Sequence, residues 1–397
     1  MATTIRIRSN AGPYDVFCAR GSFAKLRPLV ARLGDATGLY VLSSPRVWKF
    51  WGSTVARRVG VNAKHVILFD DSESRKRLAT IEEIARKLTR AGADRRCILL
   101  AVGGGVVGDV AGFAAATYLR GVRIVHVPTT LVAQVDSAIG GKTGVDLPEG
   151  KNLVGAFHPP QLVVVDPELL RTLPQREYRS GLYEVVKYGI IADAKLFDFL
   201  EKHMDELLRR DAAALDRVIP RCIAIKAAVV NADEHESGLR KILNYGHTLG
   251  HAFEAATHYK RFLHGEAIGW GMIAATLLSV QAFRLPLLDC FRILRIIWRI
   301  GPLPALPTIR SGELRELLVS DKKTRGREVG WVLANRIGQT EWDIRLPDAR
   351  VRKTVDALPQ VMVELRRTGG EPILGIIQGP SNVRGSKYPS SRGMANR

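Results

Sequence analysis

The chain has 397 residues, of which 46% are hydrophobic and 25% are charged. This balance is typical of globular proteins and excludes collagen, a coiled coil and wholesale disorder, while the length allows two or three average domains. Lys and Arg outnumber Asp and Glu by 59 to 39, which gives a net charge of +20. Such an excess fits nucleic acid, an acidic membrane surface or polyanionic small substrates. Because the basic residues are scattered and form no block, we favour a small anionic substrate and expect no nucleic-acid partner.

We expect neither a signal peptide nor a membrane partner. The first ten residues lack the apolar core of a signal peptide. The longest apolar stretch, Ala267 to Val280, falls short of the roughly 20 residues that cross a bilayer, so it predicts a buried helix. The four cysteines are widely spaced without a CxxC pair, which predicts reduced, structural thiols. A soluble, cytoplasmic protein is the expectation.

Short apolar runs in the first part of the chain predict seven strands. Most are bounded by Gly, Asp or Pro, as expected of a sheet that is covered on both faces. They lie at residues 4–9, 14–19, 38–44, 64–70, 97–105, 122–130 and 162–168. Helical patterns separate them, such as Ala79 to Gly92, where Ile81, Ile84 and Leu88 share one stripe. This alternation predicts a parallel α/β sheet.

The pattern changes near Tyr178. From there to about Gln281 nearly every segment has a helical period, which predicts a second, mainly helical domain. Residues 311–337 predict a helix, a polar loop and a short strand. After Arg366 the chain is rich in Gly, Pro, Ser and basic residues, which predicts a disordered basic tail. We therefore expect an α/β Rossmann-like domain at 1–177, a helical domain at 178–365 and the tail at 366–397.

A glycine-rich turn follows the fifth predicted strand. Residues 103–108 read G-x-G-x-x-G between an apolar run and a helical pattern. Such glycines let the backbone approach a pyrophosphate at a helix N-terminus, although a tight turn without ligand is an alternative. The acid that a Rossmann unit offers about 20 residues later is missing, because the next strand ends in Thr129 and Thr130. The pattern indicates a dinucleotide site without the usual ribose contact.

Histidines and one glutamate suggest a metal site in the helical part. His247 and His251 lie four residues apart on one predicted helical face, and His264 opens the long apolar helix. A catalytic divalent metal takes three protein ligands from His and carboxylate groups. Glu184, His247 and His264 could supply them, although each histidine alone fits an ordinary hydrogen-bonded residue. The absence of HExxH argues against a metalloprotease of that type.

Cations form a further group, since several lie beside glycine turns or inside apolar runs. Each could be a solvated surface residue. Burial of an ammonium group is costly unless an anion compensates for it, so we expect an anionic substrate with phosphate and carboxylate groups. The residues of this group, with nearby polar side chains, are Asp136, Lys142, Lys151, Asn152, Lys187, Lys226, Arg240, Lys322 and Lys323.

Six blocks in this order resemble 3-dehydroquinate synthases, and they span about Val102 to Gly338. The blocks are residues 103–122, 127–160, 172–189, 238–254, 263–272 and 321–323. The resemblance implies a Rossmann-like domain followed by a helical metal-binding domain, in a homodimer. It also implies cyclisation of 3-deoxy-D-arabino-heptulosonate 7-phosphate to 3-dehydroquinate with phosphate release, in the shikimate pathway. The implied cofactors are NAD and a divalent metal, zinc or cobalt.

The same resemblance implies roles for individual residues. Metal ligands would be Glu184, His247 and His264. Substrate contacts would be Asp136, Lys142, Asn152, Lys187, Lys226, Arg240, Asn244, His251 and one of Lys322 or Lys323, with Arg120 reaching the phosphate end from the partner subunit. NAD contacts would be Glu73, Lys76, Gly104, Gly105, Asp109, Thr129, Thr130, Lys142, Lys151 and Thr172.

The chain departs from the family pattern on the adenosine side of NAD. Ser72 stands where a glycine is usual, and Ser43 or Ser44 stands where an acid is often found. Other functions remain open at this point: another sugar phosphate cyclase of the valiolone or inosose type, an iron-dependent alcohol or glycerol dehydrogenase, or a non-catalytic polyanion-binding protein. Net NADH formation would mark a dehydrogenase, whereas a steep salt dependence without phosphate release would mark a binding protein.

Overall fold

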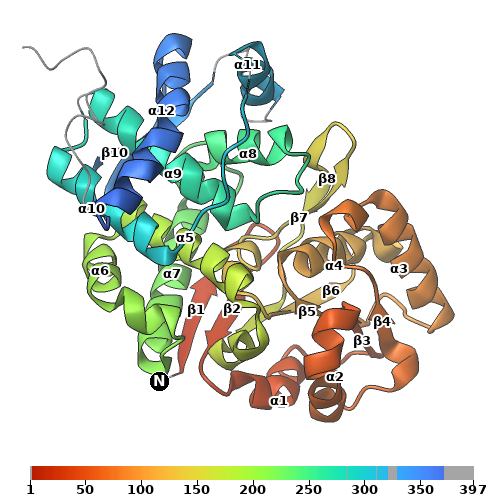
Figure 1. Ribbon diagram of the computed structural model, residues 1–397. Helices are drawn as coiled ribbons and strands as arrows, with labels where there is room; N and C mark the ends of the chain where they lie inside the picture. The colour runs from red at the N-terminus through yellow and green to blue at the C-terminus, as the bar shows by residue number, and fades with distance from the viewer. Residues whose placement is uncertain (1, 283, 310, 321–328, 371–397) are drawn as a thin grey trace, which may run out of the picture.

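All seven predicted strands are present and form one sheet in the structure, a computed structural model that describes residues 2–282, 284–309, 311–320 and 329–370 (Figure 1). The strand order is β1-β2-β9-β6-β5-β3-β4. Only the β1–β2 pair is antiparallel, and the other pairs are parallel, as the alternation predicted. Their bounds are β1 Thr3–Ile7, β2 Tyr14–Cys18, β3 Leu39–Ser43, β4 Val66–Leu68, β5 Ile98–Gly103, β6 Arg123–Pro128 and β9 Leu162–Val165.

Helices cover both faces of this sheet, which explains the continuous apolar runs. One face packs against α1 (Leu26–Ala31) and α2 (Pro45–Val59). The other packs against α3 (Leu78–Arg90) and α4 (Gly105–Thr117). The interior strand β5 is buried along its whole length, as expected of a parallel strand with helices on both sides. The predicted Rossmann-like fold is confirmed for this part of the chain.

Helices dominate the rest of the chain, as predicted. Their bounds are α5 Gln175–Ala192, α6 Ala194–Leu208, α7 Ala212–Ala232, α8 His247–Ala256, α9 His264–Gln281, α10 Leu287–Ile300, α11 Ser311–Ser320 and α12 Asp348–Arg367. The apolar segment predicted as a buried helix is α9, which is buried on all sides over most of its length. Among the described residues, no helix is both long and apolar enough to cross a bilayer.

Two hairpins depart from the sequence-based expectations. Strands β7 (Lys142–Leu147) and β8 (Gly150–Phe157) form an antiparallel pair within a segment in which no strand was predicted. Strand β10 (Trp331–Arg336) matches the predicted short strand, but its partner β11 (Gln339–Ile344) was not predicted. Helix α12 continues to Arg367, and the tail prediction for 371–397 lies outside the described residues.

Glycines allow α8 and α9 to cross at backbone contact. A Cβ atom on Gly271 would lie 1.8 Å from the carbonyl oxygen of Gly246 and 2.9 Å from the amide nitrogen of Gly250. Gly246 itself has a φ of 81°, in the left-handed region, and directly precedes His247. This crossing therefore fixes where the first turn of α8 lies relative to α9.

The crossing predicts a clear stability difference between two glycine substitutions. Gly271→Ala is expected to lower the free energy of unfolding by about 2 kcal/mol, because overpacking outweighs the gain of about 1 kcal/mol in helix propensity. Gly108→Ala, on α4, is the control, since its Cβ would meet nothing closer than His126 at 3.7 Å. Urea unfolding measures both variants. Equal stability of the two would contradict the close crossing.

Candidate active site

A large cavity lies between the sheet and the helical part, with a volume of about 1370 Å³. Its lining comes from the turn after β5, the β7–β8 hairpin and helices α5, α7, α8 and α9. The glycine turn lies on one side: β5 ends at Gly103 and α4 begins at Gly105. A Cβ on Gly104 would lie 2.9 Å from the Thr130 methyl group, so a larger residue there would require Thr130 to move. The predicted strand–turn–helix context of the glycine motif is confirmed.

On the other side, three helices bring together the residues predicted as metal ligands. Glu184 on α5, His247 on α8 and His264 on α9 each offer a ligand atom, and these atoms all lie within 4.8 Å of one another. Glu184 Oε1 is 3.5 Å from His247 Nε2 and 3.6 Å from His264 Nε2. Carboxylate and imidazole ligands at this separation suit a divalent ion.

The environment of Glu184 supports this assignment. Its carboxylate is fully buried, and neither oxygen accepts a hydrogen bond from the residues that the structure describes. The ammonium group of Lys187, one turn further along α5, forms an ion pair with it. Burial of a carboxylate without hydrogen bonds is costly, and an ion bound between Glu184, His247 and His264 would remove that cost. The donor set therefore fits a divalent metal.

A second carboxylate, Glu254, lies beside this cluster and was not predicted. With His251 and His264 it forms another group whose ligand atoms lie within 4.8 Å of one another. Glu254 follows His247 by seven residues and His251 by three, so all three lie on one face of α8. This spacing was available in the sequence. Burial opposes protonation of His264, but the carboxylates of Glu184 and Glu254 outweigh it and raise the pKa of His264 to about 9.

The predicted cations gather in the same cavity, but most have carboxylate partners within the chain. Lys226 Nζ donates to Asp136 Oδ1 at 2.7 Å, and Tyr188 donates its hydroxyl proton to the same oxygen at 2.7 Å. Lys142 forms an ion pair with Glu236. The expectation that a substrate must supply the compensating anion therefore does not hold for these lysines. Burial outweighs the attraction of Asp136 and lowers the pKa of Lys226 to about 8.

Arg240 is the exception among the buried cations. It is 2% exposed, and its guanidinium donates to the backbone carbonyls of Glu234 and Gly140 rather than to a carboxylate. Burial lowers the pKa of Arg240, although nearby acids oppose that shift. A guanidinium that lines a cavity without a direct carboxylate partner among the described residues is suited to bind an anionic group of a ligand.

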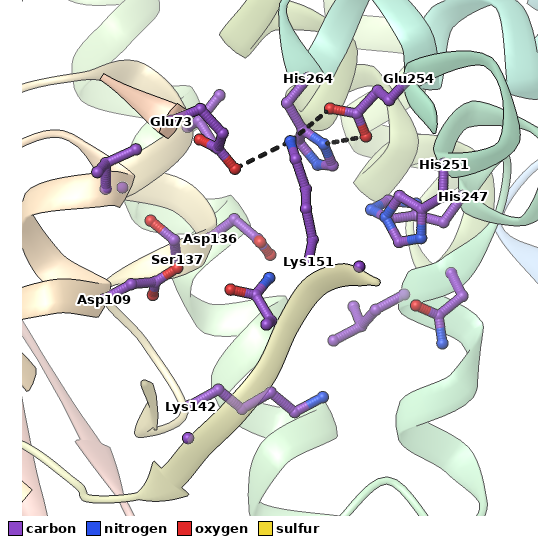
Figure 2. Close-up of a pocket in the computed structure, with 18 of the residues that line it drawn as sticks. Glu73, Asp109, Asp136, Ser137, Lys142, Lys151, His247, His251, Glu254 and His264 are labelled. Atoms are coloured by element: carbon purple, nitrogen blue, oxygen red, sulfur yellow. Dashed lines mark hydrogen bonds and ion pairs between the residues drawn. The ribbon is translucent and has the colours of Figure 1, made fainter. Parts of the chain in front are cut away.

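Residues predicted to contact NAD lie between the glycine turn and the β7–β8 hairpin. Lys76 Nζ is 2.6 Å from Asp109 Oδ2 and also donates to the side chain of Asn152. Lys151 lies 3.0 Å from both Glu73 and Glu254, and Figure 2 shows it reaching between them. Asn152 was expected to touch the substrate; in the structure its side-chain oxygen accepts a hydrogen bond from Lys76, which was expected to contact NAD.

Not every predicted site residue lines the cavity. Glu184 is fully buried and is not among the residues that line it. Thr129 is buried, and its amide donates to the Gly103 carbonyl oxygen at 2.9 Å. Thr172 accepts a hydrogen bond from Trp51 at 3.0 Å. Arg120 follows α4 and does not line the cavity of its own chain. Lys322 and Lys323 lie outside the described residues. The predicted residues that do line it are Glu73, Lys76, Gly104, Gly105, Asp109, Thr130, Asp136, Lys142, Lys151, Asn152, Lys187, Lys226, Arg240, Asn244, His247, His251 and His264.

Comparison with known families gives one consistent result. Residues 66–180 match the model of the 3-dehydroquinate synthase N-terminal domain, and residues 181–324 match that of the C-terminal domain. The chain is 45% identical over 301 residues to 3-dehydroquinate synthase from Solibacter usitatus, covering 76% of this chain and 84% of the relative. It is 41% identical over 354 residues to that from Bordetella pertussis, covering 89% and 98%.

Solved structures of related cyclases have the same fold. The 2-epi-5-epi-valiolone synthase ValA from Streptomyces hygroscopicus, with NAD+ and Zn2+ bound, matches with a TM-score of 0.80 at 28% identity, over 91% of this chain and 99% of that one. A 2-deoxy-scyllo-inosose synthase with carbaglucose-6-phosphate, NAD+ and Co2+ also has a TM-score of 0.80 at 28% identity, over 89% and 99%. Glycerol dehydrogenase from Schizosaccharomyces pombe, at 15% identity, covers 88% of this chain and 90% of its own and shares the fold with a TM-score of 0.62.

Proposed function

The chain belongs to the 3-dehydroquinate synthase family, and we propose that its cavity converts 3-deoxy-D-arabino-heptulosonate 7-phosphate to 3-dehydroquinate with release of phosphate. The reaction is a step of the shikimate pathway to aromatic amino acids. The observation that carries the proposal is that one cavity is lined by the glycine turn, by a group of cations, and by His247 and His264, whose ring nitrogens lie within 4.8 Å of a carboxylate oxygen of the fully buried Glu184.

NAD and a divalent metal serve as cofactors, and when bound they supply a hydride acceptor and a Lewis acid that polarises substrate oxygens. Glu184, His247 and His264 would hold the metal. The glycine turn leaves room for a pyrophosphate at the N-terminus of α4. The residues proposed around NAD are Glu73, Lys76, Gly104, Gly105, Asp109, Thr129, Thr130, Lys142, Lys151 and Thr172.

The chain's own side chains bind and orient the doubly anionic substrate. Arg240 offers donors for a carboxylate, while the Lys142 and Lys226 ammonium groups add positive charge along the cavity. Because Asp136 and Tyr188 fix the position of Lys226, this charge is already oriented before substrate binds, which lowers the entropy cost of orientation. Asn152, Lys187, Asn244, His251 and one of Lys322 or Lys323 complete the proposed substrate contacts.

A related cyclase acting on another sugar phosphate is the nearest alternative. The chain is 41 to 50% identical to 3-dehydroquinate synthases and 28% identical to the two solved cyclases. Arg240 also favours a substrate that carries a carboxylate. To test this, purified protein is incubated with the heptulosonate phosphate, NAD and Zn2+. We expect phosphate and 3-dehydroquinate in equal amounts with no net NADH. Phosphate release without that product would point to another cyclase, and NADH accumulation to a dehydrogenase.

Loss of Arg240 is expected to weaken substrate binding selectively. Arg240→Ala should raise KM for the heptulosonate phosphate by about 30-fold or more, since truncation of a buried charged contact costs about 2–5 kcal/mol. NAD affinity should stay within about twofold. Steady-state kinetics and NAD titration measure the two effects. Arg20→Ala is the control, because the Arg20 guanidinium pairs with Asp216 at 3.0 Å and neither residue lines the cavity. A normal KM in Arg240→Ala would remove this residue from the substrate site.

We also propose a homodimer in the cytoplasm. Arg120 is implied to reach the phosphate end of the partner's site, and its absence from the lining of its own cavity agrees with that role. All four cysteines are buried and free, as is typical of proteins from a reducing compartment. The substrate is a small sugar phosphate, and no nucleic-acid or membrane partner is proposed.

A further inference from the structure

The carboxylate of Glu254 contacts two different cationic partners, one through each oxygen. It lies on α8 and is 2% exposed. Its Oε1 atom is 3.0 Å from the Lys151 ammonium group on β8. Its Oε2 atom faces His264 Nδ1 at 3.5 Å and has no hydrogen-bond partner among the described residues. Figure 2 shows both contacts converging on this carboxylate.

The two ring nitrogens of His264 therefore face different carboxylates. Nε2 faces Glu184, in the proposed metal cluster, at 3.6 Å, whereas Nδ1 faces Glu254. An imidazole that binds a metal through Nε2 carries its proton on Nδ1. That proton needs an acceptor, and acceptors of this kind fix the orientation of the ring and raise its basicity. The unsatisfied Oε2 atom of Glu254 is placed to be this acceptor.

We propose that Glu254 is a positioning residue that orients His264 for metal binding and also anchors Lys151. The inference rests on the proposed function, because it takes Glu184, His247 and His264 as the metal ligands. Glu254 contacts neither substrate nor metal in this role. The position of Glu254 is itself constrained, because its helix α8 packs against α9 at the close backbone contact between Gly246 and Gly271.

Through Lys151, the same carboxylate joins the metal side of the cavity to the cofactor side. Lys151 also lies 3.0 Å from Glu73, which follows β4 in the sheet domain, and its ammonium group is 4.5 Å from the centre of the Tyr259 ring. The Glu254 carboxylate thus neutralises the charge of the Lys151 ammonium group and also faces the ring nitrogen of His264 that is not proposed to bind the metal. Loss of its charge should affect the metal through His264 and the hairpin through Lys151.

A direct role of Glu254 as ligand is the alternative, since His251, Glu254 and His264 also form a group of metal-ligand type. Both groups contain His264. A neutral imidazole has one lone pair for a metal and a proton on its other nitrogen, so His264 cannot serve both groups at once. One metal ion per chain is therefore expected, with Glu254 acting through the ring.

The test measures metal affinity directly. Zn2+ affinity of the full-length protein is determined by competition with a chelator, and Co2+ absorption spectra report the ligand geometry. Glu254→Ala should weaken Zn2+ binding by about 10- to 100-fold, as loss of such an acceptor typically does. Glu254→Gln should recover part of the affinity, because an amide oxygen still accepts the Nδ1 proton. This graded recovery distinguishes positioning from a purely structural role.

Glu73→Ala is the matched control, since it removes the other ion pair of Lys151 without touching His264. Its Zn2+ affinity should stay within twofold of the unsubstituted chain. Zn2+ affinity of Glu254→Ala equal to that of the unsubstituted chain, an equal loss in Glu73→Ala, or two bound ions per chain would each overturn the proposal. If Glu254→Ala does not fold, Glu254→Gln is the test: Zn2+ affinity and a Co2+ spectrum equal to those of the unsubstituted chain would overturn the proposal, and a weakened affinity would support it. Tight Zn2+ binding by a His264→Ala variant would instead refute the underlying metal assignment.

Discussion

Replacement of His264 with alanine is expected to remove the bound metal and lower turnover by at least about a thousandfold. The substitution leaves two of three ligands, Glu184 and His247, beside the Lys187 ammonium group. Polarisation of substrate oxygens by a metal is worth several kcal/mol, and each 1.36 kcal/mol corresponds to a tenfold change in rate. NAD affinity should be retained, because the glycine turn lies on the opposite side of the cavity from the metal cluster.

Metal content after gel filtration, turnover and NAD titration test this expectation on one protein sample. His203→Ala on α6 is the control, since that imidazole stacks on Phe199 and lies near Glu206 on the surface. The His264 variant should unfold at nearly the same urea concentration as the unsubstituted chain. Unchanged metal content with an unchanged rate would reject His264 as a ligand.

The contrast between the main sheet and the β7–β8 hairpin shows what the sequence could predict. Strand β5 is buried over six consecutive positions, so its apolar run was a sufficient signal. Strand β8 has no buried residue, so selection for an apolar pattern is weak there. Gly144 and Gly155 pair across the hairpin, and a Cβ on Gly155 would lie 2.1 Å from the Thr143 carbonyl oxygen. Glycine is needed at positions 144 and 155 because the two backbones approach closely, and not because of hydrophobic burial.

In the candidate site too, some residues could be predicted from local sequence spacing, whereas others depend on contacts between distant segments of the chain. The spacing of His247 and His251 on one turn of a helix indicated a metal site but left an ordinary hydrogen-bonded role open, and the family resemblance supplied the role of each residue. Glu254, on the same face, went unused because a single glutamate near the end of a helix resembles a surface residue. Glu236 lies in the irregular segment after α7 with a φ of 61°. Its ion pair with Lys142 depends on chain segments almost a hundred residues apart, which no local pattern encodes.

Variants of the Asp136–Lys226 pair are expected to separate stability from turnover, because the double variant should regain stability but not activity. Asp136→Asn should lower the free energy of unfolding by about 3 kcal/mol, because it leaves the ammonium group of a 5%-exposed lysine without a carboxylate. The Asp136 pKa lies well below its usual range: burial opposes this shift, but the charges of Lys226 and Lys187 outweigh it. The carboxylate is therefore charged at neutral pH, and the asparagine variant removes a full charge.

The double variant Asp136→Asn/Lys226→Met separates the structural contribution of the pair from its catalytic one. Replacement of both partners removes the uncompensated charge, and exchange of a buried ion pair for neutral groups is often neutral or stabilising. We therefore expect the double variant to recover most of the stability lost in Asp136→Asn, with a coupling energy of about 1–3 kcal/mol in the double-mutant cycle. Urea unfolding of the four proteins measures this energy.

Turnover should follow a different pattern in the same four proteins. If the Lys226 ammonium group binds the substrate, both single variants and the double variant should lose activity. The double variant should stay inactive although its stability is regained, because it still lacks an ammonium group in the cavity. Tyr188→Phe provides a milder comparison, since it removes one hydrogen bond to Asp136 and leaves the ion pair intact. A double variant that regains both stability and turnover would mean that the pair only maintains the fold. The substrate charge would then have to be bound by Arg240, Lys142 and the other proposed cationic contacts without Lys226.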